Sequence, residues 1–187
     1  SDAYSSGIYE AFKAKMAELN VSYIEQSFDA ENNRDFSTQV EALKDCDVIF
    51  LPIYYTEAGL IAKACVAKGC DAFLFGCDGL DGIDAIEGFD ISSIPQEISM
   101  LSHFNSKATE GAAADYIKKY TEKFGTETLN QFGASAYDCV YAIYGAMKEA
   151  KAEGKDINPG MSASDLCEIL KEKFNGGYTY SGNTGTN

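Results

Sequence analysis

The stretch CDVIFLPIYYTEAGLIAKACVAKGCDAFLFGCDG, at residues 46–79, decides the fold. It contains two short apolar runs, VIFLPI at 48–53 and AFLFG at 72–76, and a helical segment between them that ends at Gly69. Short continuous apolar runs are typical of strands buried on both faces of a parallel sheet, and parallel strands need a crossover connection. The stretch therefore predicts a β-α-β unit.

The sequence on both sides continues the alternation of helix and strand. Ile8, Phe12 and Met16 recur at helical spacing, and Asp35 or Ser37 can cap a later helix. We expect these further elements: a helix over 7–20, a strand over 21–28 (VSYIEQSF), a helix carrying Phe36, Val40 and Leu43, a weak helix after the loop CDGLDGID at 77–84, a fourth strand over 97–102 (EISMLS), helices over 107–124, 132–151 and 162–174, and one short strand within 176–187. This order predicts an α/β fold of three layers, α/β/α, around a mostly parallel sheet.

The chain is expected to be one lobe of a larger protein. In a doubly wound sheet a strand precedes the helix predicted over 7–20, yet the sequence starts at the loop that would follow that strand. It also stops among turn residues, GGYTYSGNTGTN. We therefore expect residues 1–187 to form a single lobe, truncated at both ends.

Composition narrows the possible partners. The 187 residues are 45% hydrophobic, enough for a real core, and 29 acidic against 15 basic residues give a net charge of −14. This charge repels nucleic acid and anionic membrane surfaces. The sequence has neither an apolar run of membrane-spanning length nor, in SDAYSSGIYE, the pattern of a signal peptide, so localisation must be inferred from other features.

The six cysteines offer no obvious metal site. They lack a C-x-x-C pair, and His103 is the sole histidine in the sequence. Most of the cysteines have apolar neighbours in the sequence, as in AKACVAK and SAYDCVYAI, and are expected to be small buried residues. Disulfides stay open as an alternative, and the candidate pairs nearest in sequence are Cys65 with Cys70 and Cys65 with Cys77.

Candidate binding residues follow the predicted strands. Ligands of open parallel sheets bind beyond the carboxyl ends of the strands. That rule selects Tyr4 in the opening loop, Tyr54 or Tyr55 after the first apolar run, and Cys77 with Asp78 after the second. Neighbouring side chains at a strand end point oppositely, so we expect one tyrosine of the pair at most to face the ligand and the other to belong to the core.

Asp78 is the sharpest candidate because a carboxylate at this edge can pair with a ligand ammonium group. A turn or helix cap is the structural alternative, although Asp81 is better placed as a cap. The spacing of Asp78, Asp81 and Asp84 lacks the alternate ligands and closing Glu of a calcium loop. We therefore expect no metal.

Catalysis has little support in the sequence. It contains no G-x-S-x-G elbow, P-loop or dinucleotide fingerprint, so neither an enzyme activity nor a cofactor is expected. His103 has no Ser, Cys or Asp partner nearby in sequence and is expected to be structural or exposed.

These positions resemble the leucine/isoleucine/valine-binding protein family, type I periplasmic binding proteins of ABC transporters. The similar segments are SDAYSSGIYEAFKAKM, RDFSTQVEALK, CDVIFLPIYYTEAGLIAKACVAKG and SAYDCVYAIYGAMKEA, in the family's order and spacing. The resemblance implies that Tyr4 lies at the lobe entrance, that Tyr54 covers the ligand, and that Asp78, where many relatives have Glu, holds the ligand's α-amino group.

The resemblance also implies the setting of the protein. It implies the C-terminal lobe of an extracytoplasmic protein, periplasmic or a cell-surface lipoprotein, that binds branched-chain or related amino acids without catalysis. The expected partners are the amino acid, a missing N-terminal lobe that binds its α-carboxylate, and a membrane permease. Two other functions stay open: a sensor domain of a receptor or transcription regulator with the same fold, and an enzyme on a flavodoxin-like scaffold.

Overall fold

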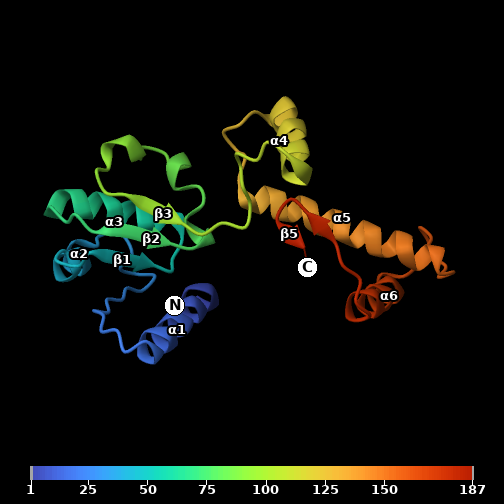
Figure 1. Ribbon diagram of the computed structural model, residues 1–187, viewed down its shortest axis with the longest axis horizontal. Helices are drawn as coiled ribbons and strands as arrows, with labels where there is room; N and C mark the ends of the chain where they lie inside the picture. Colours follow the sequence, from blue (N-terminus) through green and yellow to red (C-terminus); the bar gives the residue numbers. More distant parts are fainter. Residues whose placement is uncertain (1, 187) are drawn as a thin grey trace. The chain divides into compact units, whose positions relative to one another are not determined.

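The computed structural model describes residues 2–186, so Ser1 and Asn187, both within the predicted lobe of 1–187, lie outside the described residues. The chain divides into two compact units, Ser1–Ser102 and His103–Asn187 (Figure 1). The sequence predicted one lobe without this division. That the two units serve a single lobe stays a prediction.

The first unit holds the parallel sheet. Its order is β1 (Val48–Leu51), β2 (Phe73–Gly76), β3 (Ile98–Met100), with every pair parallel. Around it lie α1 (Ala3–Glu18), α2 (Ser37–Leu43) and α3 (Tyr55–Lys68), and three 3₁₀ turns join β2 to β3: η1 (Asp78–Leu80), η2 (Ile83–Ala85) and η3 (Ile91–Ser93). The predicted β-α-β unit, β1-α3-β2, and the strand within 97–102 are confirmed.

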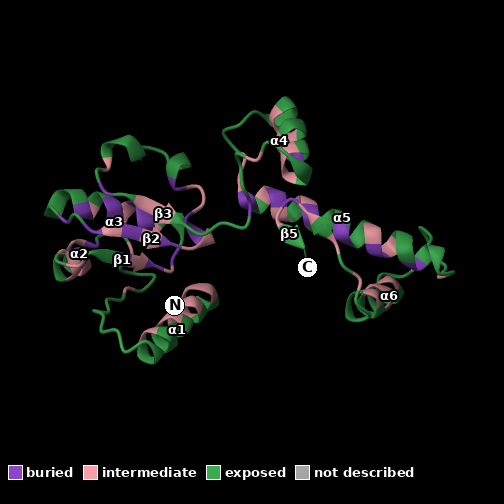
Figure 2. Cartoon of the chain, viewed as in Figure 1, coloured by how far each residue is buried: buried purple, intermediate pink, exposed green. Residues whose placement is uncertain are grey.

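Alternation along the strands gives the sheet two different faces. Ile49, Leu51 and Leu74 are at most 5% exposed and pack with residues of α2 and α3, where the buried residues of Figure 2 gather. On the opposite face Phe50 stacks on Phe12 of α1, with ring centroids 4.8 Å apart. Helices therefore cover both faces, and the predicted α/β/α layering is confirmed.

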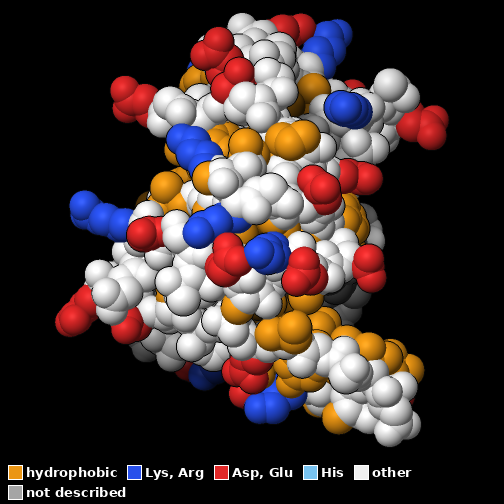
Figure 3. Space-filling model, turned by 90° about the vertical axis from the view of Figure 1, so that its left-hand side faces the viewer, with side chains coloured by type: hydrophobic (Ala, Val, Ile, Leu, Met, Phe, Trp, Pro, Cys, Tyr) orange, Lys and Arg blue, Asp and Glu red, His pale blue; other side chains and the backbone are white. Residues whose placement is uncertain are grey.

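The strand predicted over 21–28 is wrong. The segment follows α1 as an irregular stretch, and the sheet order provides it with no partner among the described residues. A ladder needs hydrogen bonds from a neighbouring strand, which side-chain alternation alone cannot supply. Val21 and Ile24 follow the end of α1 in sequence and stay exposed. Figure 3 shows hydrophobic side chains gathered on the surface at the lower end of its view.

The end of α3 is as predicted. Gly69 caps the helix in the left-handed region, with φ of +65°, which glycine adopts without steric cost. The weak helix expected after CDGLDGID is instead the series of 3₁₀ turns.

The second unit is mainly helical. It contains α4 (Gly111–Phe124), α5 (Gln131–Ala152) and α6 (Ala163–Asn175), which confirm the three predicted helices with small shifts at their ends. The single strand expected near the end is a minimal antiparallel hairpin of β4 (Ser181–Gly182) and β5 (Gly185–Thr186). Phe104 packs edge-on against Tyr116 in its small core.

A buried carboxylate fixes the hairpin to α5. Asp138 is 7% exposed and accepts hydrogen bonds from Asn183 Nδ2 at 2.7 Å and from Thr184 N and Oγ1, each at 2.8 Å. Gly182 lies against the same carboxylate, where a side chain would collide with it. The motif SAYDCVYAI therefore carries a structural anchor at Asp138.

The buried residues of α5 are alanines apart from Gln131 and Asp138. Ala134, Ala142, Ala146 and Ala150 are buried, whereas Val140 is 65% exposed. The expectation that most cysteines are buried is wrong. Cys65 and Cys70 are buried, Cys46 and Cys77 are partly buried, and Cys139 and Cys167 are exposed. Apolar neighbours in sequence lie on several faces of a helix, so they do not fix the burial of one position.

Candidate functional site

The three predicted ligand residues lie together at the carboxyl edge of the sheet. Tyr54 stands between β1 and α3, and Asp78 begins η1 two residues after β2. Tyr4 comes from α1, whose first turn reaches this edge and contacts both residues. One cluster therefore joins side chains that are as many as 74 positions apart in the chain.

Tyr4 lies in a helix and not in the predicted opening loop. The Asp2 side chain accepts a hydrogen bond from Ser5 N at 3.0 Å and caps α1, which starts at Ala3 and ends at Glu18. The apolar stripe used for the prediction begins only at Ile8, so it could not locate this first turn. The cap, an Asp before a Ser three residues later, is the signal that locates it.

The Tyr4 hydroxyl is held from two sides. It donates to Asp78 Oδ1 at 2.7 Å and accepts from Gly79 N at 2.8 Å. A Cβ at residue 79 would lie 2.6 Å from the Ile53 carbonyl oxygen and 2.9 Å from the Tyr4 hydroxyl. Glycine is thus required at 79 for this close approach, and sequence reasoning assigned it no role.

Tyr54 adds an aromatic surface. Its ring stacks on the ring of Tyr4 with centroids 4.9 Å apart and an interplanar angle of 26°, and 44% of the residue stays exposed. Tyr55 instead lies near Gly82 of the loop after η1. The adjacent tyrosines therefore diverge, and Tyr54 is the one that stacks on Tyr4. The expectation that the other tyrosine of the pair belongs to the core is wrong, because Tyr55 is 39% exposed.

Burial and charge fix the protonation of this cluster. Burial, reinforced by the hydrogen bond to Asp78, raises the pKa of Tyr4 far above its ordinary value of 10.0. Burial and then the Asp78 carboxylate raise the pKa of the Cys77 thiol. At neutral pH both groups keep their protons, so Tyr4 acts as a donor and orients the carboxylate.

Asp78 is the first residue of the turn η1, and neither Asp78 nor Asp81 is the N-cap of η1 or η2. The N-cap of η1 is Cys77 and that of η2 is Gly82, and neither turn has a side-chain cap hydrogen bond. Asp81 is the C-cap of η1, where its N–H donates to the Asp78 carbonyl oxygen at 3.0 Å. Within residues 2–186 no group of three or more His, Cys, Asp or Glu side chains is arranged to hold a metal ion.

His103 has a partner that its sequence neighbours did not reveal. Its Nε2 lies 2.7 Å from Ser135 Oγ, a residue of α5 that is 32 positions away. The hydrogen bond is exposed and joins the start of the second unit to α5. Sequence proximity could not identify this pair.

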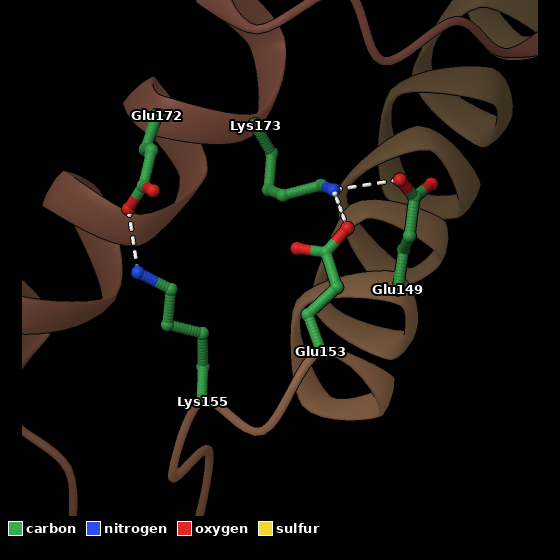
Figure 4. A network of polar contacts seen from close by, with 5 residues as sticks. All are labelled: Glu149, Glu153, Lys155, Glu172 and Lys173. Carbon is green, nitrogen blue, oxygen red and sulfur yellow. Dashed lines mark hydrogen bonds and ion pairs between the residues drawn. The ribbon is translucent and has the colours of Figure 1, made fainter.

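A concave region lies between α5 and α6, away from the Tyr4, Tyr54 and Asp78 cluster in sequence. It is a cavity of about 400 Å³ bordered by acidic side chains and Lys173. Lys173 Nζ lies 2.6 Å from Glu149 Oε1 and 2.7 Å from Glu153 Oε1, as Figure 4 shows. These hydrogen bonds raise the pKa of Lys173, and Lys155 pairs with Glu172 beside them. Three carboxylates meet two ammonium groups here, so an excess of negative charge remains. None of the predicted ligand residues borders this cavity.

Comparisons with known proteins agree with the predicted resemblance. No family model matches the sequence. The chain is 24% identical over 150 residues to the Leu/Ile/Val-binding protein homolog 3 of Brucella melitensis, covering 79% of this chain and 39% of that protein. The resemblance to the leucine/isoleucine/valine-binding proteins is thereby confirmed.

Solved structures give the same result for the fold. The leucine-binding protein LivK of Thermotoga maritima has a TM-score of 0.76 at 22% identity, over 98% of this chain and 49% of that one. The branched-chain amino acid transporter substrate-binding protein LivJ of Streptococcus pneumoniae, in complex with isoleucine, has a TM-score of 0.72 at 23% identity, over 98% and 48%. The chain thus spans about half the length of these proteins and shares their α/β fold.

Proposed function

We propose that this chain supplies part of an extracytoplasmic solute-binding protein that captures branched-chain or related amino acids for an ABC transporter. The observation that carries the proposal is the Tyr4, Tyr54 and Asp78 cluster at the carboxyl edge of the parallel sheet. Ligands of open α/β sheets bind at this edge. The similar proteins include one in complex with isoleucine, LivJ, and one from Desulfitobacterium hafniense in complex with Leu.

In the proposed site Asp78 holds the ligand's ammonium group. A charge-assisted hydrogen bond of this kind contributes roughly 1.5–3 kcal/mol. Tyr4 orients the carboxylate by donating to one of its oxygens, and the half-exposed ring of Tyr54 offers apolar surface to the ligand side chain. The cluster accounts for binding and contains no nucleophile paired with a base, so the proposed function is non-catalytic.

The other half of the proposed site comes from a second lobe. Small-molecule sites bury most of the ligand surface, and the cluster described here covers only one side of it. The ligand's α-carboxylate would bind to that lobe, and closure of the two lobes would exclude water. A membrane permease is the proposed receiver of the amino acid. Within residues 2–186 no helix has both the length and the apolar character to cross a membrane.

The 187-residue chain is expected to bind free amino acids weakly or not at all, because half of the contacts and the closure are missing. Titration calorimetry with leucine and isoleucine measures this directly. Micromolar affinity for leucine in the 187-residue chain would contradict the two-lobe proposal.

The role of Asp78 is tested in a longer protein that joins these residues to a first lobe. Asp78→Asn keeps the shape and leaves an oxygen for the Tyr4 hydroxyl but removes the charge. Affinity for a zwitterionic amino acid is expected to fall at least tenfold, about 1.4 kcal/mol. Asp81→Asn is the matched control, since it removes a carboxylate from the same turn three residues away. Normal binding by Asp78→Asn, or unfolding of that variant, would show that Asp78 is structural.

A further inference from the structure

Two cysteines meet at the end of α3. The helix closes with a six-to-one hydrogen bond from Cys70 N to the Cys65 carbonyl oxygen, at 3.0 Å, and another from Gly69 N to the Val66 carbonyl oxygen, at 3.3 Å. Together with the left-handed Gly69, these bonds define a Schellman motif. In this motif the side chains on either side of the six-to-one bond face each other, and here both of them are cysteines.

The thiols of Cys65 and Cys70 are in contact and fully buried. Both residues are 0% exposed, and their side chains lie within hydrogen-bonding reach of each other. The backbone hydrogen bond holds the two free cysteines close together in one turn, and proximity is the first condition for a disulfide.

The other cysteines are less well placed for either thiol. Cys77 lies beyond the opposite end of β2 from Cys70, and the four residues of the strand between them, Phe73–Gly76, span about 13 Å. Cys139 and Cys167 belong to the second unit and are exposed. Cys46 stands before β1 and is half-buried, so it is the competitor that an experiment has to examine.

We propose that Cys65 and Cys70 are a disulfide-forming pair that locks the C-terminal turn of α3. With a small disulfide as the oxidant, one protein thiolate attacks it, forms a mixed disulfide and releases one small thiol. The second protein thiolate then attacks the mixed disulfide at the protein sulfur and releases the second small thiol. Two protein thiols thus lose two electrons and two protons, and one small disulfide becomes two thiols.

Burial sets the time at which this reaction occurs. A small disulfide has no access to thiols that are 0% exposed, so the folded chain reacts only when the last turn of α3 opens. During folding the same thiols are accessible, and the short loop between them places each near the other. Oxidation is therefore expected during folding, after which the core protects the bond from reductants.

Peptide mapping after refolding tests the proposal. The reduced chain is refolded with oxidised glutathione, remaining thiols are alkylated, and the protein is cleaved with trypsin without reduction. Cleavage after Lys63, Lys68 and Lys107 puts Cys65 in the peptide 64–68 and Cys70 in the peptide 69–107. The expected result is one linked species of the two peptides, two hydrogen atoms lighter than their sum, which separates on reduction.

Three single variants identify the partners. Cys77→Ser is expected to keep the link, although residue 77 shares a peptide with Cys70, and Cys46→Ser is also expected to keep it. Cys70→Ser is expected to abolish the link. Oxidation is expected to raise the melting temperature of the unsubstituted chain by several degrees, and Cys70→Ser is expected to lose this rise. Recovery of the peptide 64–68 unlinked and alkylated, or linked to a peptide that carries another cysteine, would overturn the proposal.

Discussion

Tyr4→Phe deletes one oxygen atom from the centre of the candidate site. The hydroxyl donates to Asp78 Oδ1 at 2.7 Å and accepts from Gly79 N at 2.8 Å, so both contacts disappear together. A hydrogen bond to a charged group contributes about 1.5–3 kcal/mol, and partial exposure of Tyr4 places the loss at the low end of that range. We expect the free energy of unfolding of the first unit to fall by about 1.5–2 kcal/mol, because the ring and its stacking on Tyr54 remain.

Urea denaturation followed by far-ultraviolet circular dichroism measures this loss. With a slope of about 2 kcal/mol per molar urea, the midpoint is expected to fall by slightly less than about 1 M at unchanged slope. Tyr55→Phe is the matched control, since it removes the same atom from the adjacent tyrosine near Gly82. Exchange of the Gly79 amide is expected to accelerate in Tyr4→Phe alone. Equal midpoints for the two variants would refute the view that Tyr4 anchors α1 to the Asp78 turn.

Two further predictions concern buried acidic groups. Asp138→Ala is expected to lower the stability of the second unit by about 1–3 kcal/mol and to release the β4–β5 hairpin, because it strands the donors of Asn183 and Thr184; faster amide exchange at Thr184 checks this. Burial, with a smaller effect of Cys70, raises the pKa of Cys65 from 9.0 to about 12. Between these pH values the unfolded chain releases a proton that the folded chain keeps, so the stability of the reduced chain falls as pH rises, by at most about 1.4 kcal/mol per pH unit. Denaturation across pH 9–12 is expected to give a shallower decline for Cys65→Ala, and identical slopes would contradict this assignment.

The sequence predicted the β1-α3-β2 core because several local signals agree there. The apolar runs are too short for helices, Gly69 ends the intervening segment, and the parallel pairing of Val48 with Phe73 follows from that connection. In such a unit ligands bind beyond the carboxyl ends of the parallel strands, so the unit also predicts where the site lies. The sequence alone therefore predicts that Tyr54 and Asp78 lie at the same edge of the sheet.

The errors come from interactions that a local pattern does not contain. Residues 21–28 alternate like a strand, but a strand exists only where another backbone completes its hydrogen bonds. The apolar stripe of α1 begins later than its cap at Asp2, so the stripe alone predicts a loop at Tyr4. Both errors concern the hydrogen-bond partner of a backbone group: residues 21–28 have no pairing strand, and the Asp2 side chain accepts from the Ser5 N–H.

The contrast between Asp78 and Asp138 shows which carboxylates a sequence can assign. Both are aspartates held by residues far away in the chain, Tyr4 at 74 positions and Asn183 at 45. Asp78 follows a recognisable strand, so a general rule about sheet edges applies to it. Asp138 lies within a helix, where no rule of position distinguishes a solvated acid from an anchor, and its donors belong to a turn-rich segment without periodicity. A carboxylate can thus be assigned from sequence when its element fixes its position in the fold, whereas one defined by a long-range hairpin has to be observed.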